Sequence, residues 1–400
     1  MSLLSVDEAK ARILKGVKPA AAETVDIEDA LGRVLARDVK ATRDQPPFDS
    51  SAMDGYAVKF RDVTVPPARL LNIGMSAAGH AFGGRVKAGQ AVRIFTGAPV
   101  PDGADTVVIQ ENTKVQGAAV TVLHAPRQGQ NIRPRGLDFA RGDVLLRAST
   151  ILGARDLGLA AAANRSSLAV RRHPRVAILA TGDELVRPGA RPRADQIFAS
   201  NGYALKGLIY RFGGKPFDLG IVGDDLRATM RAIARARDAD VLVTTGGASV
   251  GMHDLVQEAL TRSGIKLDFW KIAMRPGKPL MFARQGGRRI IGLPGNPVSA
   301  LVCARIFLKP LLSGFLGLPS EDDLVEAQLE APLPANDQRQ DYVRAKLARA
   351  VDGSYRVSAF PKQDSSMQRT FAEAGGLIVR EPFAPAVKEG SMVRVLPLDF

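Results

Sequence analysis

The chain has 400 residues, a formal net charge of +14 and a single cysteine, Cys303. This length exceeds what one hydrophobic core usually supports, so we expect roughly two to four domains. One cysteine excludes an internal disulfide framework and a thiolate metal cluster. Because it falls in an apolar helical run (300–308), we expect a buried, inert thiol.

The positive charge favours an anionic partner. However, the basic residues are scattered along the chain, and aromatic residues make up only 6% of it. Proteins that bind single-stranded nucleic acid use basic grooves with aromatic side chains on which the bases stack. This pattern is missing from the sequence, so we expect a small anionic ligand and no nucleic acid. The sequence has neither a signal peptide nor a stretch approaching about 18 continuous apolar residues, which predicts a cytoplasmic protein without a membrane partner.

The first part of the chain predicts a small helical region that β-structure interrupts. Ser5 and Glu8 have the spacing of a capping box, so a helix is expected to follow Ser5. Further helices are expected over 27–36 and from Thr150 to Asn164. Between them, short β-type runs alternate with Gly and Pro turns, which predicts an inserted all-β module. We expect a helical linker region (1–40 and 148–174), whose first helix can instead pack on the following domain, and the all-β module at 41–147.

From residue 175 to 320, strands and helices alternate, which predicts an α/β domain with a mostly parallel sheet and covering helices. The expected strands are 176–180, 218–222, 241–245, 280–283 and 289–293, and the expected helices are 203–212, 226–237, 255–263 and 299–312. Short strands return over 321–400, with Asp352-Gly353 as a hairpin turn. They predict a C-terminal β-barrel-like domain.

Four loops of the α/β domain each follow a strand, so we expect them at one sheet edge, where ligands bind in such folds. The β-branched strand 241–245 ends in Gly246-Gly247, and glycines let backbone N–H groups approach an anion. The loops supply hydroxyl groups, backbone donors and carboxylates, a mixture that suits a phosphorylated ligand with Mg²⁺. The candidates are Thr181, Glu184, Asp224, Gly246, Gly247, Ser249, Asp254, Pro294, Gly295, Asn296, Pro297 and Ser299.

Two interpretations remain open for the acidic candidates. Asp224 and Asp254 fit Mg²⁺ ligands, and each equally fits a helix cap, because each shortly precedes a predicted helix. Glu184 fits either a functional group or a solvated loop carboxylate, and Asp183 is interpreted as structural. The four histidines are dispersed without metal-ligand spacing, and His253 alone lies in a candidate loop.

The basic segment 271–279 (KIAMRPGKP) contains Lys271, Arg275 and Lys278 within eight residues. Its prolines and glycine exclude a regular helix, so we expect a stiff loop that presents the charges at a fixed site. The alternative is a solvated basic turn. Fixed cations of this kind would bind a phosphate or another oxyanion.

The β module carries three further candidate segments. They are 46–57 (PPFDSSAMDGYA) with Asp54, 93–104 (RIFTGAPVPDGA) with Thr96, and 131–138 (NIRPRGLD) with Arg133 and Asp138. Asp54 alternatively serves only as a turn carboxylate. The chain has no Walker-type phosphate loop, and no Ser-His-Asp or Cys-His order points to a nucleophile.

These motifs, in this order, resemble those of the molybdopterin molybdenumtransferases, the molybdenum-cofactor enzymes related to the gephyrin E domain. The matching strings run over nearly the whole chain: FDSSAMDGYAV (48–58), RIFTGAPVPDGADTVV (93–108), NIRPRGLD (131–138), ATGDELV (180–186), TTGGASVGMHD (244–254), FWKIAMRPGKP (269–279) and GLPGNPVSAL (292–301).

The resemblance implies insertion of molybdate into adenylated molybdopterin, with Mg²⁺-dependent hydrolysis of the adenylate and release of AMP. It implies four domains and a homodimer whose active cleft lies between the α/β domain of one chain and the β module of the other. Its catalytic residues fall on Asp54, Asp138, Glu184, Lys271 and Arg275. Its substrate-binding positions include Thr96, Arg133, Lys278, Pro294, Pro297 and either Ser365 or Ser366, and its metal ligands are Asp224 and Asp254. Other molybdenum-cofactor proteins are possible partners.

Arg275 departs from this pattern, because lysine is common there in bacterial relatives, and arginine offers a planar fork instead of a point charge. The chemistry fits the residues: the basic segment suits molybdate, Glu184 or Asp54 would handle protons, and the turn at 294–297 would direct backbone N–H groups to the oxyanion. Two alternatives remain: a non-catalytic molybdopterin-binding or scaffold protein, and a different nucleotide hydrolase on the same α/β unit.

Overall fold

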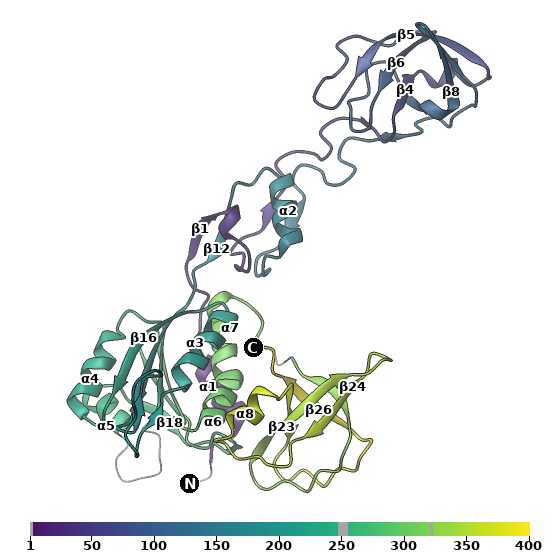
Figure 1. Ribbon diagram of the computed structural model, residues 1–400. Helices are drawn as coiled ribbons and strands as arrows, with labels where there is room; N and C mark the ends of the chain where they lie inside the picture. Colours follow the sequence, from purple (N-terminus) through teal and green to yellow (C-terminus); the bar gives the residue numbers. More distant parts are fainter. Residues whose placement is uncertain (1–2, 247–254, 321–322) are drawn as a thin grey trace. The chain divides into compact units, whose positions relative to one another are not determined.

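The computed structural model describes residues 3–246, 255–320 and 323–400 (Figure 1). The chain folds into two compact units. Unit 1 comprises residues 1–24, 32–36 and 169–400, and unit 2 comprises residues 25–31 and 37–168. The boundaries fall near β1 (Ala22–Asp26) and β12 (Ser167–Arg171).

Unit 1 is built on a six-stranded sheet in the order β16-β13-β17-β21-β20-β18. The first four strands pair in parallel, and the two remaining pairings, β21 with β20 and β20 with β18, are antiparallel, which confirms the mostly parallel sheet. Their bounds are β16 (Lys215–Val222), β13 (Arg175–Thr181), β17 (Val241–Thr245), β21 (Arg288–Leu293), β20 (Met281–Gln285) and β18 (Leu267–Trp270). Strand β17 is buried along its whole length, as its β-branched composition predicts.

Helices cover both faces of this sheet. Consecutive residues of a strand point to opposite sides, and in β13 both sets of side chains are buried against helices. Val176 and Ile178 pack in the core with α1, α3, α6 and α7, whereas Ala177 and Leu179 pack with α4 and α5. The helices are α1 (Val6–Leu14), α3 (Asn201–Arg211), α4 (Leu226–Arg235), α5 (Leu255–Arg262), α6 (Pro297–Cys303) and α7 (Lys309–Leu316). A π-helical turn, Ala304–Leu308, joins α6 to α7.

The continuous helix Pro297–Leu316 forms the centre of the first core. It is long and apolar enough to cross a membrane, but 83% of its most apolar window is buried inside the protein. Cys303 is fully buried in it, and burial raises the pKa of its thiol. The expectation of a buried, inert thiol is therefore confirmed.

The C-terminal part of unit 1 is a closed five-stranded barrel, which confirms the barrel-like prediction. Strands follow the order β23-β24-β22-β26-β25, and β25 pairs back to β23. They are β22 (Val325–Leu329), β23 (Gln340–Arg349), β24 (Tyr355–Ala359), β25 (Gly376–Arg380) and β26 (Met392–Pro397), with α8 (Gln368–Ala372) between β24 and β25. Asp352-Gly353 turns β23 into β24. Strand β19 (Met274–Arg275), from the basic segment, pairs with β23.

Unit 2 contains a six-stranded sheet in the order β7-β4-β6-β5-β9-β8. Its strands are β4 (Gly55–Val58), β5 (Ala68–Ser76), β6 (Gln90–Ile94), β7 (Thr106–Ile109), β8 (Thr113–Gln116) and β9 (Ala119–Val122). Short pairs join β2 (Val39–Lys40) to β11 (Val144–Leu146) and β3 (Ser50–Ser51) to β10 (Ile132–Arg133), and α2 (Ala154–Ala162) follows. Unit 1 has one more short pair, β14 (Leu185–Val186) with β15 (Ile197–Phe198).

One helix prediction is wrong, and a second helix is present but begins later than predicted. Residues 27–36 form a single 3-10 turn, Ile27–Asp29, because Gly32 is left-handed and Leu35 makes a β-bridge with Val170. Helix α2 begins after Gly153, where the Asp156 carboxylate accepts the Gly153 N–H, so Thr150 is not its cap. Further 3-10 turns lie at Phe60–Asp62 and Gln110–Asn112.

Candidate functional site

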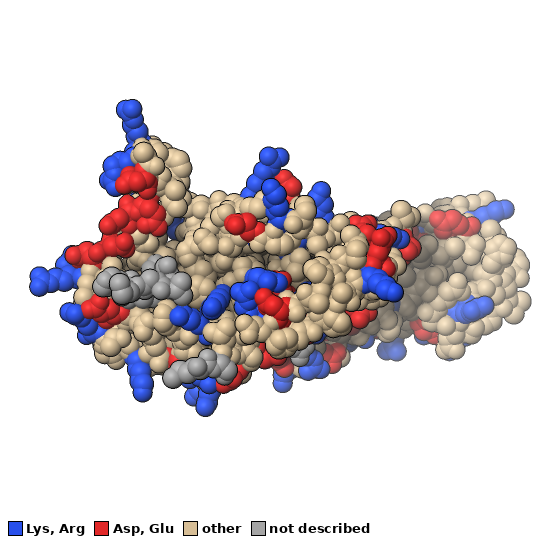
Figure 2. Space-filling view, turned by 90° about the horizontal axis from the view of Figure 1, so that it is seen from below, with Lys and Arg blue, Asp and Glu red and all other residues tan. Residues whose placement is uncertain are grey.

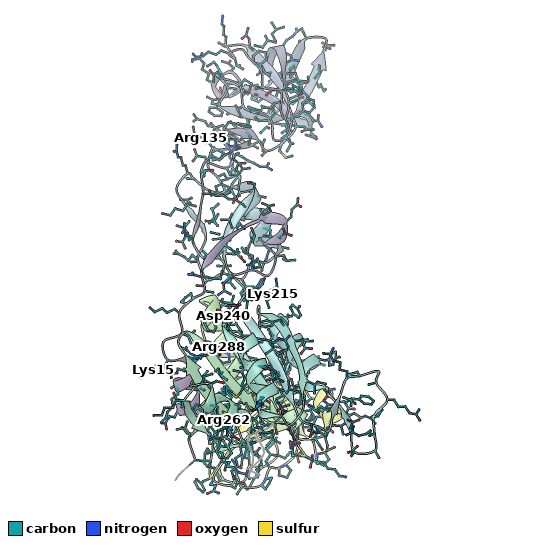
Figure 3. All side chains as sticks on the ribbon, turned by 90° about the vertical axis from the view of Figure 1, so that its left-hand side faces the viewer. Lys15, Arg135, Lys215, Asp240, Arg262 and Arg288 are labelled. Atoms are coloured by element: carbon teal, nitrogen blue, oxygen red, sulfur yellow. The ribbon has the colours of Figure 1, made fainter. Side chains whose placement is uncertain are left out.

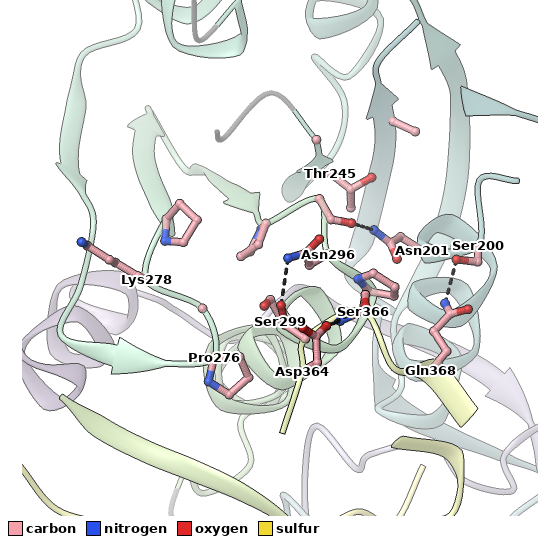
Figure 4. A pocket seen from close by; sticks show the side chains of 18 of the residues that line it. Ser200, Asn201, Thr245, Pro276, Lys278, Asn296, Ser299, Asp364, Ser366 and Gln368 are labelled. Atoms are coloured by element: carbon pink, nitrogen blue, oxygen red, sulfur yellow. Dashed lines mark hydrogen bonds between the residues drawn. The ribbon is translucent and has the colours of Figure 1, made fainter. Parts of the chain in front are cut away.

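A pocket of about 960 Å³ opens at the carboxyl ends of the parallel strands of unit 1 (Figure 4). Its walls come from three parts of the unit: the strand-end loops, the basic segment and the C-terminal barrel. The volume lies in the range of small-molecule sites. The predicted residues that line it are Thr181, Glu184, Gly246, Lys271, Arg275, Lys278, Pro294, Gly295, Asn296, Pro297, Ser299, Ser365 and Ser366.

Gly246 ends the central strand at the pocket wall, and only glycine fits there. Its φ is +88°, in the left-handed region, and a Cβ would overlap the carbonyl oxygen of Thr181 on the neighbouring strand. The predicted close approach of the backbone is therefore real, although here its nearest partner is another strand. Gly295 lies next to Gly246: a Cβ added to Gly295 would lie 3.6 Å from the Cα of Gly246.

Two adjacent carboxylates, Asp224 and Asp225, have different roles. The Asp225 side chain caps α4 by accepting the Ala228 N–H at 2.5 Å. The Asp224 backbone N–H donates to the Asp183 carboxylate at 3.0 Å, which supports a structural role for Asp183. The Asp224 carboxylate is exposed and has no hydrogen bond or ion pair with another described residue. Capping therefore does not explain Asp224.

The basic segment presents its three cations differently. Arg275 donates to Asp341 from Nε at 3.0 Å and to Asp337 from Nη1 at 3.1 Å, and its hydrogen bond to Asp341 raises its pKa. The ammonium of Lys271 lies 4.0 Å from the centre of the Trp270 ring. Neither Lys271 nor Lys278 forms an ion pair with any part of the chain that the structure describes. At the pocket, these two lysines therefore remain without a counter-charge among the described residues.

The barrel contributes the loop around Ser365 and Ser366. The Asn296 amide donates to the Ser365 hydroxyl at 2.8 Å, and the Val298 N–H donates to the Ser365 carbonyl at 3.1 Å. The second bond uses one of the N–H groups at the start of α6, just after the turn at 294–297, so this N–H group is not available to a ligand. Ser366 donates two hydrogen bonds to Asp364, which lower the pKa of that carboxyl.

Sequence reasoning missed several polar residues of the pocket, among them Ser200, Asn201 and Gln368. Asn201 donates to the Gly295 carbonyl at 2.7 Å, and Gln368 donates to the Ser200 hydroxyl at 2.7 Å (Figure 4). Ser200 and Asn201 begin α3, and this position just before the predicted helix 203–212 was the available signal. Gln368 comes from the barrel, 168 residues away in the chain, and no sequence pattern indicated it.

The candidates of the β module lie in unit 2. Asp54 accepts the backbone N–H and the hydroxyl of Thr96, both at 2.8 Å, and these bonds lower the pKa of its carboxyl. The next residue, Gly55, cannot carry a Cβ, because it would overlap the Val108 carbonyl. Arg133 lies in β10, opposite Ser50, and Asp138 is exposed. The predicted pair Asp54 and Thr96 therefore meets within unit 2.

Three predicted site residues, Gly247, Ser249 and Asp254, and also His253, lie outside the described residues. Within the described ranges, no three His, Cys, Asp or Glu side chains form a group that could hold a metal ion. On the face shown in Figure 2, basic side chains are interspersed with acidic ones, in keeping with a small anionic ligand.

Three family models match consecutive parts of the chain. "MoeA N-terminal region (domain I and II)" matches residues 4–164, "Probable molybdopterin binding domain" matches 177–314, and "MoeA C-terminal region (domain IV)" matches 326–398. Together they extend over both units.

Curated relatives match over nearly their full length. A molybdopterin molybdenumtransferase from Nostoc is 36% identical over 94% of this chain and 88% of its own. One from Haemophilus influenzae is 33% identical over 99% of each chain. Among solved structures, a molybdopterin biosynthesis MoeA protein from Pyrococcus horikosii has a TM-score of 0.87 and 29% identity over 99% of both chains.

Proposed function

The chain belongs to the molybdopterin molybdenumtransferase family, and from this premise we propose that it inserts molybdate into adenylated molybdopterin. In this reaction the adenylate is hydrolysed, AMP is released and the molybdenum cofactor is formed. The observation that carries the proposal is the pocket, where Lys271 and Lys278 provide positive charge without a carboxylate partner among the described residues. Molybdate is a dianion and the pyrophosphate link of the substrate is anionic, so both need such cations.

The rest of the pocket suits the pterin nucleotide. Its volume of about 960 Å³ accommodates a ligand of that size. Ser299, Asn296 and Asn201 offer hydroxyl and amide groups that bind and orient the polar edges of the substrate. The dithiolene sulfurs that receive molybdenum belong to the substrate, which is consistent with a protein whose only thiol is buried.

Magnesium fits the oxygen donors on this sheet edge. Mg²⁺ is usually bound through one or two carboxylates together with substrate phosphates and water. The Asp224 carboxylate is exposed and engaged with no described residue, while Asp225 serves as the helix cap. Asp224 and Asp254 would hold the ion, and the ion would neutralise the pyrophosphate charge.

Glu184 is the better proton carrier of the two predicted carboxylates. It lines the pocket, is exposed and makes no side-chain hydrogen bond to a described residue. Asp54 accepts two hydrogen bonds from Thr96, which lower its pKa and keep it ionised. An ionised Asp54 serves better as a fixed acceptor that orients substrate, whereas Glu184 delivers protons to the oxygens that leave molybdate as water.

The residues of unit 2 enter through a second chain in this proposal. The enzyme acts as a homodimer in the cytoplasm, and Asp54, Thr96, Arg133 and Asp138 of one chain join the pocket of the other. In this proposal the two compact units together contain the four domains that the resemblance implies, and other molybdenum-cofactor proteins hand over substrate or receive product.

The activity is tested by incubating the purified protein with adenylated molybdopterin, Mg²⁺ and molybdate while AMP and active cofactor are measured together. We expect both products in wild type and neither in Lys271→Ala. Cofactor synthesis in cells that is unaffected by Lys271→Ala and Asp224→Ala would favour a scaffold or binding protein. AMP release from ordinary dinucleotides would favour a different nucleotide hydrolase.

The shared site is tested by mixing two inactive variants, Asp54→Ala and Lys271→Ala. If each site combines residues of two chains, a mixed dimer contains one intact site, and random mixing restores about a quarter of wild-type activity. If each site lies within one chain, both sites of the mixed dimer are defective and activity stays absent. Circular dichroism spectra that match wild type serve as the control for folding.

A further inference from the structure

Lys271 and Trp270 are consecutive residues whose side chains stack on each other. The Lys271 ammonium lies 4.0 Å from the centre of the Trp270 ring. In a regular strand, consecutive side chains point to opposite faces, so this contact requires a break in the strand. The break is visible in the backbone: β18 ends at Trp270, and Lys271 has a φ of +75°.

The left-handed backbone of Lys271 is unfavourable for a residue with a side chain, and the surrounding structure maintains it. The Lys271 N–H donates to the Leu280 carbonyl at 3.0 Å, and the Ile272 N–H donates to the Lys278 carbonyl at 2.9 Å. Ile272 itself is fully buried. The chain therefore holds Lys271 in a backbone conformation in which its ammonium lies over the preceding ring.

The choice of tryptophan at position 270 has a cost. The ring packs against the core on the α4 and α5 side of the sheet, and its indole N–H is buried without a hydrogen-bond partner among the described residues. A buried Trp N–H usually finds a partner. Phenylalanine would fill apolar space without this unpaired donor, whereas tryptophan is the aromatic residue that attracts a cation most strongly.

An aromatic partner differs from a carboxylate in what it does to a cation. Asp341 and Asp337 fix Arg275, and in doing so they neutralise its charge. The Trp270 ring attracts the Lys271 ammonium through its quadrupole and carries no net charge. Lys271 is thus restrained at the pocket wall, yet its full charge remains available to an anion.

We propose that Trp270 is a positioning residue for the transfer reaction, holding the Lys271 ammonium toward the molybdate oxyanion as an uncompensated charge. This inference rests on the proposed function. Trp270 does not line the pocket, so it acts through Lys271 and not by touching the substrate.

The first test compares the KM for molybdate, measured by AMP release, in Trp270→Leu, Trp270→Phe and the control Phe269→Leu. Removing the π face in Trp270→Leu raises KM about fivefold, and Trp270→Phe recovers part of this loss. Phe269 is a buried neighbour that stacks on Phe282, so Phe269→Leu lowers the melting temperature with little change in KM. An equal KM in Trp270→Leu and wild type would overturn the proposal, and Trp270→Phe decides it if the leucine variant does not fold.

The second test asks whether Trp270 acts through Lys271, with a double-mutant cycle on the Kd for molybdate, which equilibrium dialysis measures without turnover. If it does, Trp270→Leu has no further effect in a Lys271→Met background. If Trp270 is only structural, Trp270→Leu weakens molybdate binding equally in that background and the proposal fails. A Lys271→Met variant that binds molybdate with the wild-type Kd would instead contradict the placement of Lys271 in the proposed function, so the two failures are distinguishable.

The third test does not depend on catalysis. Trp270 is the only tryptophan of the chain, so its fluorescence reports on this one contact. We expect the emission of wild type to change as molybdate is added and that of Lys271→Met to remain constant. An equal response in both proteins would show that the ring senses molybdate without Lys271, which contradicts the proposal.

Discussion

Arg275 and Asp341 form a two-bond ion pair at the edge of the pocket. Nε of Arg275 lies 3.0 Å from Oδ2 of Asp341, and Nη2 donates to the same oxygen. The Asp341 side chain is only 14% exposed. Arg275 thus uses its planar fork on the barrel, and it fastens the basic segment instead of pointing a free charge at the ligand.

Replacing Asp341 with asparagine should therefore distinguish two roles of Arg275: holding the basic segment on the barrel and binding the anion. The loss of the paired carboxylate lowers the free energy of unfolding by about 1 kcal/mol, because Arg275 is partly exposed and solvent screens the pair. The same change leaves Arg275 with less compensation and lowers the KM for molybdate about twofold. Urea unfolding and the AMP assay measure the two effects. Asp238→Asn, an exposed change of equal charge, should alter neither quantity, and a raised KM in Asp341→Asn would contradict this interpretation.

Substituting three glycines distinguishes two contributions to the loss of stability: the left-handed backbone conformation, and the steric overlap of an added Cβ. Gly264→Ala, at φ +74° with nothing within 4 Å of an added Cβ, should cost about 1 kcal/mol of stability. Gly246→Ala has both the left-handed φ and the overlap with Thr181, and should cost at least about 2 kcal/mol more. Gly55→Ala, without a positive φ, isolates the overlap in unit 2. Equal losses in Gly246→Ala and Gly264→Ala would mean that the sheet edge relaxes freely.

Asp224 and Asp225 provide a matched pair of neighbours. Asp225→Ala removes the cap of α4 and should cost about 1 kcal/mol of stability while the Mg²⁺ dependence of AMP release stays unchanged. Asp224→Ala should leave the unfolding midpoint unchanged and raise the Mg²⁺ concentration needed for half-maximal activity about tenfold. Magnesium titrations of both variants measure this. If the two substitutions exchanged these effects, the metal assignment would be wrong.

Asp240 should make unit 1 sensitive to acid. Its burial alone would raise its pKa, but bonds from the Arg172 side chain and the Arg175 N–H outweigh burial and lower the pKa below 3.8. A carboxyl whose folded pKa is lowered contributes stability that is fully present above its unfolded pKa and is lost as the pH falls through the folded value. Figure 3 shows Asp240 near Lys215, at the strand ends away from the pocket.

Asp240→Asn should accordingly destabilise the protein by about 1–2 kcal/mol at pH 7 and by much less near pH 3. Urea unfolding between pH 3 and pH 7 gives the comparison with wild type. Asp195→Asn is the control, because its ion pair with Arg193 is exposed on both sides. A difference between Asp240→Asn and wild type that does not depend on pH would show that the carboxylate charge is not the source of the stability.

Local sequence signals predicted the fold well where the structure of a segment did not depend on long-range pairing. Val241–Thr245 matched at both ends, because a β-branched run followed by glycine leaves few alternatives. Residues 27–36 failed, since long-range pairing of Leu35 with Val170 competes with the helical pattern and no local signal reports it.

For the site, sequence spacing brought the right loops to one edge but could not assign roles to neighbours. Asp224 and Asp225 have nearly the same spacing to α4, and only the Asp183 and Ala228 contacts distinguish them. Arg275 looked like an anion ligand until its ion pairs with Asp337 and Asp341 were known. Gln368 was unpredictable, because its pairing with Ser200 depends on how the barrel docks.

The pairing of β19 with β23 links the basic segment to both halves of unit 1. Ala273 donates its N–H to Leu4 and accepts the N–H of Gln340, so residues near the beginning, middle and end of the chain share one short ladder. Deleting everything after residue 320 would remove the far side of that ladder and leave Arg275 without its counter-charges. The isolated α/β domain would therefore not hold the basic segment 271–279 in place. A chain shortened in this way would lose molybdate insertion even if its six-stranded sheet still folded.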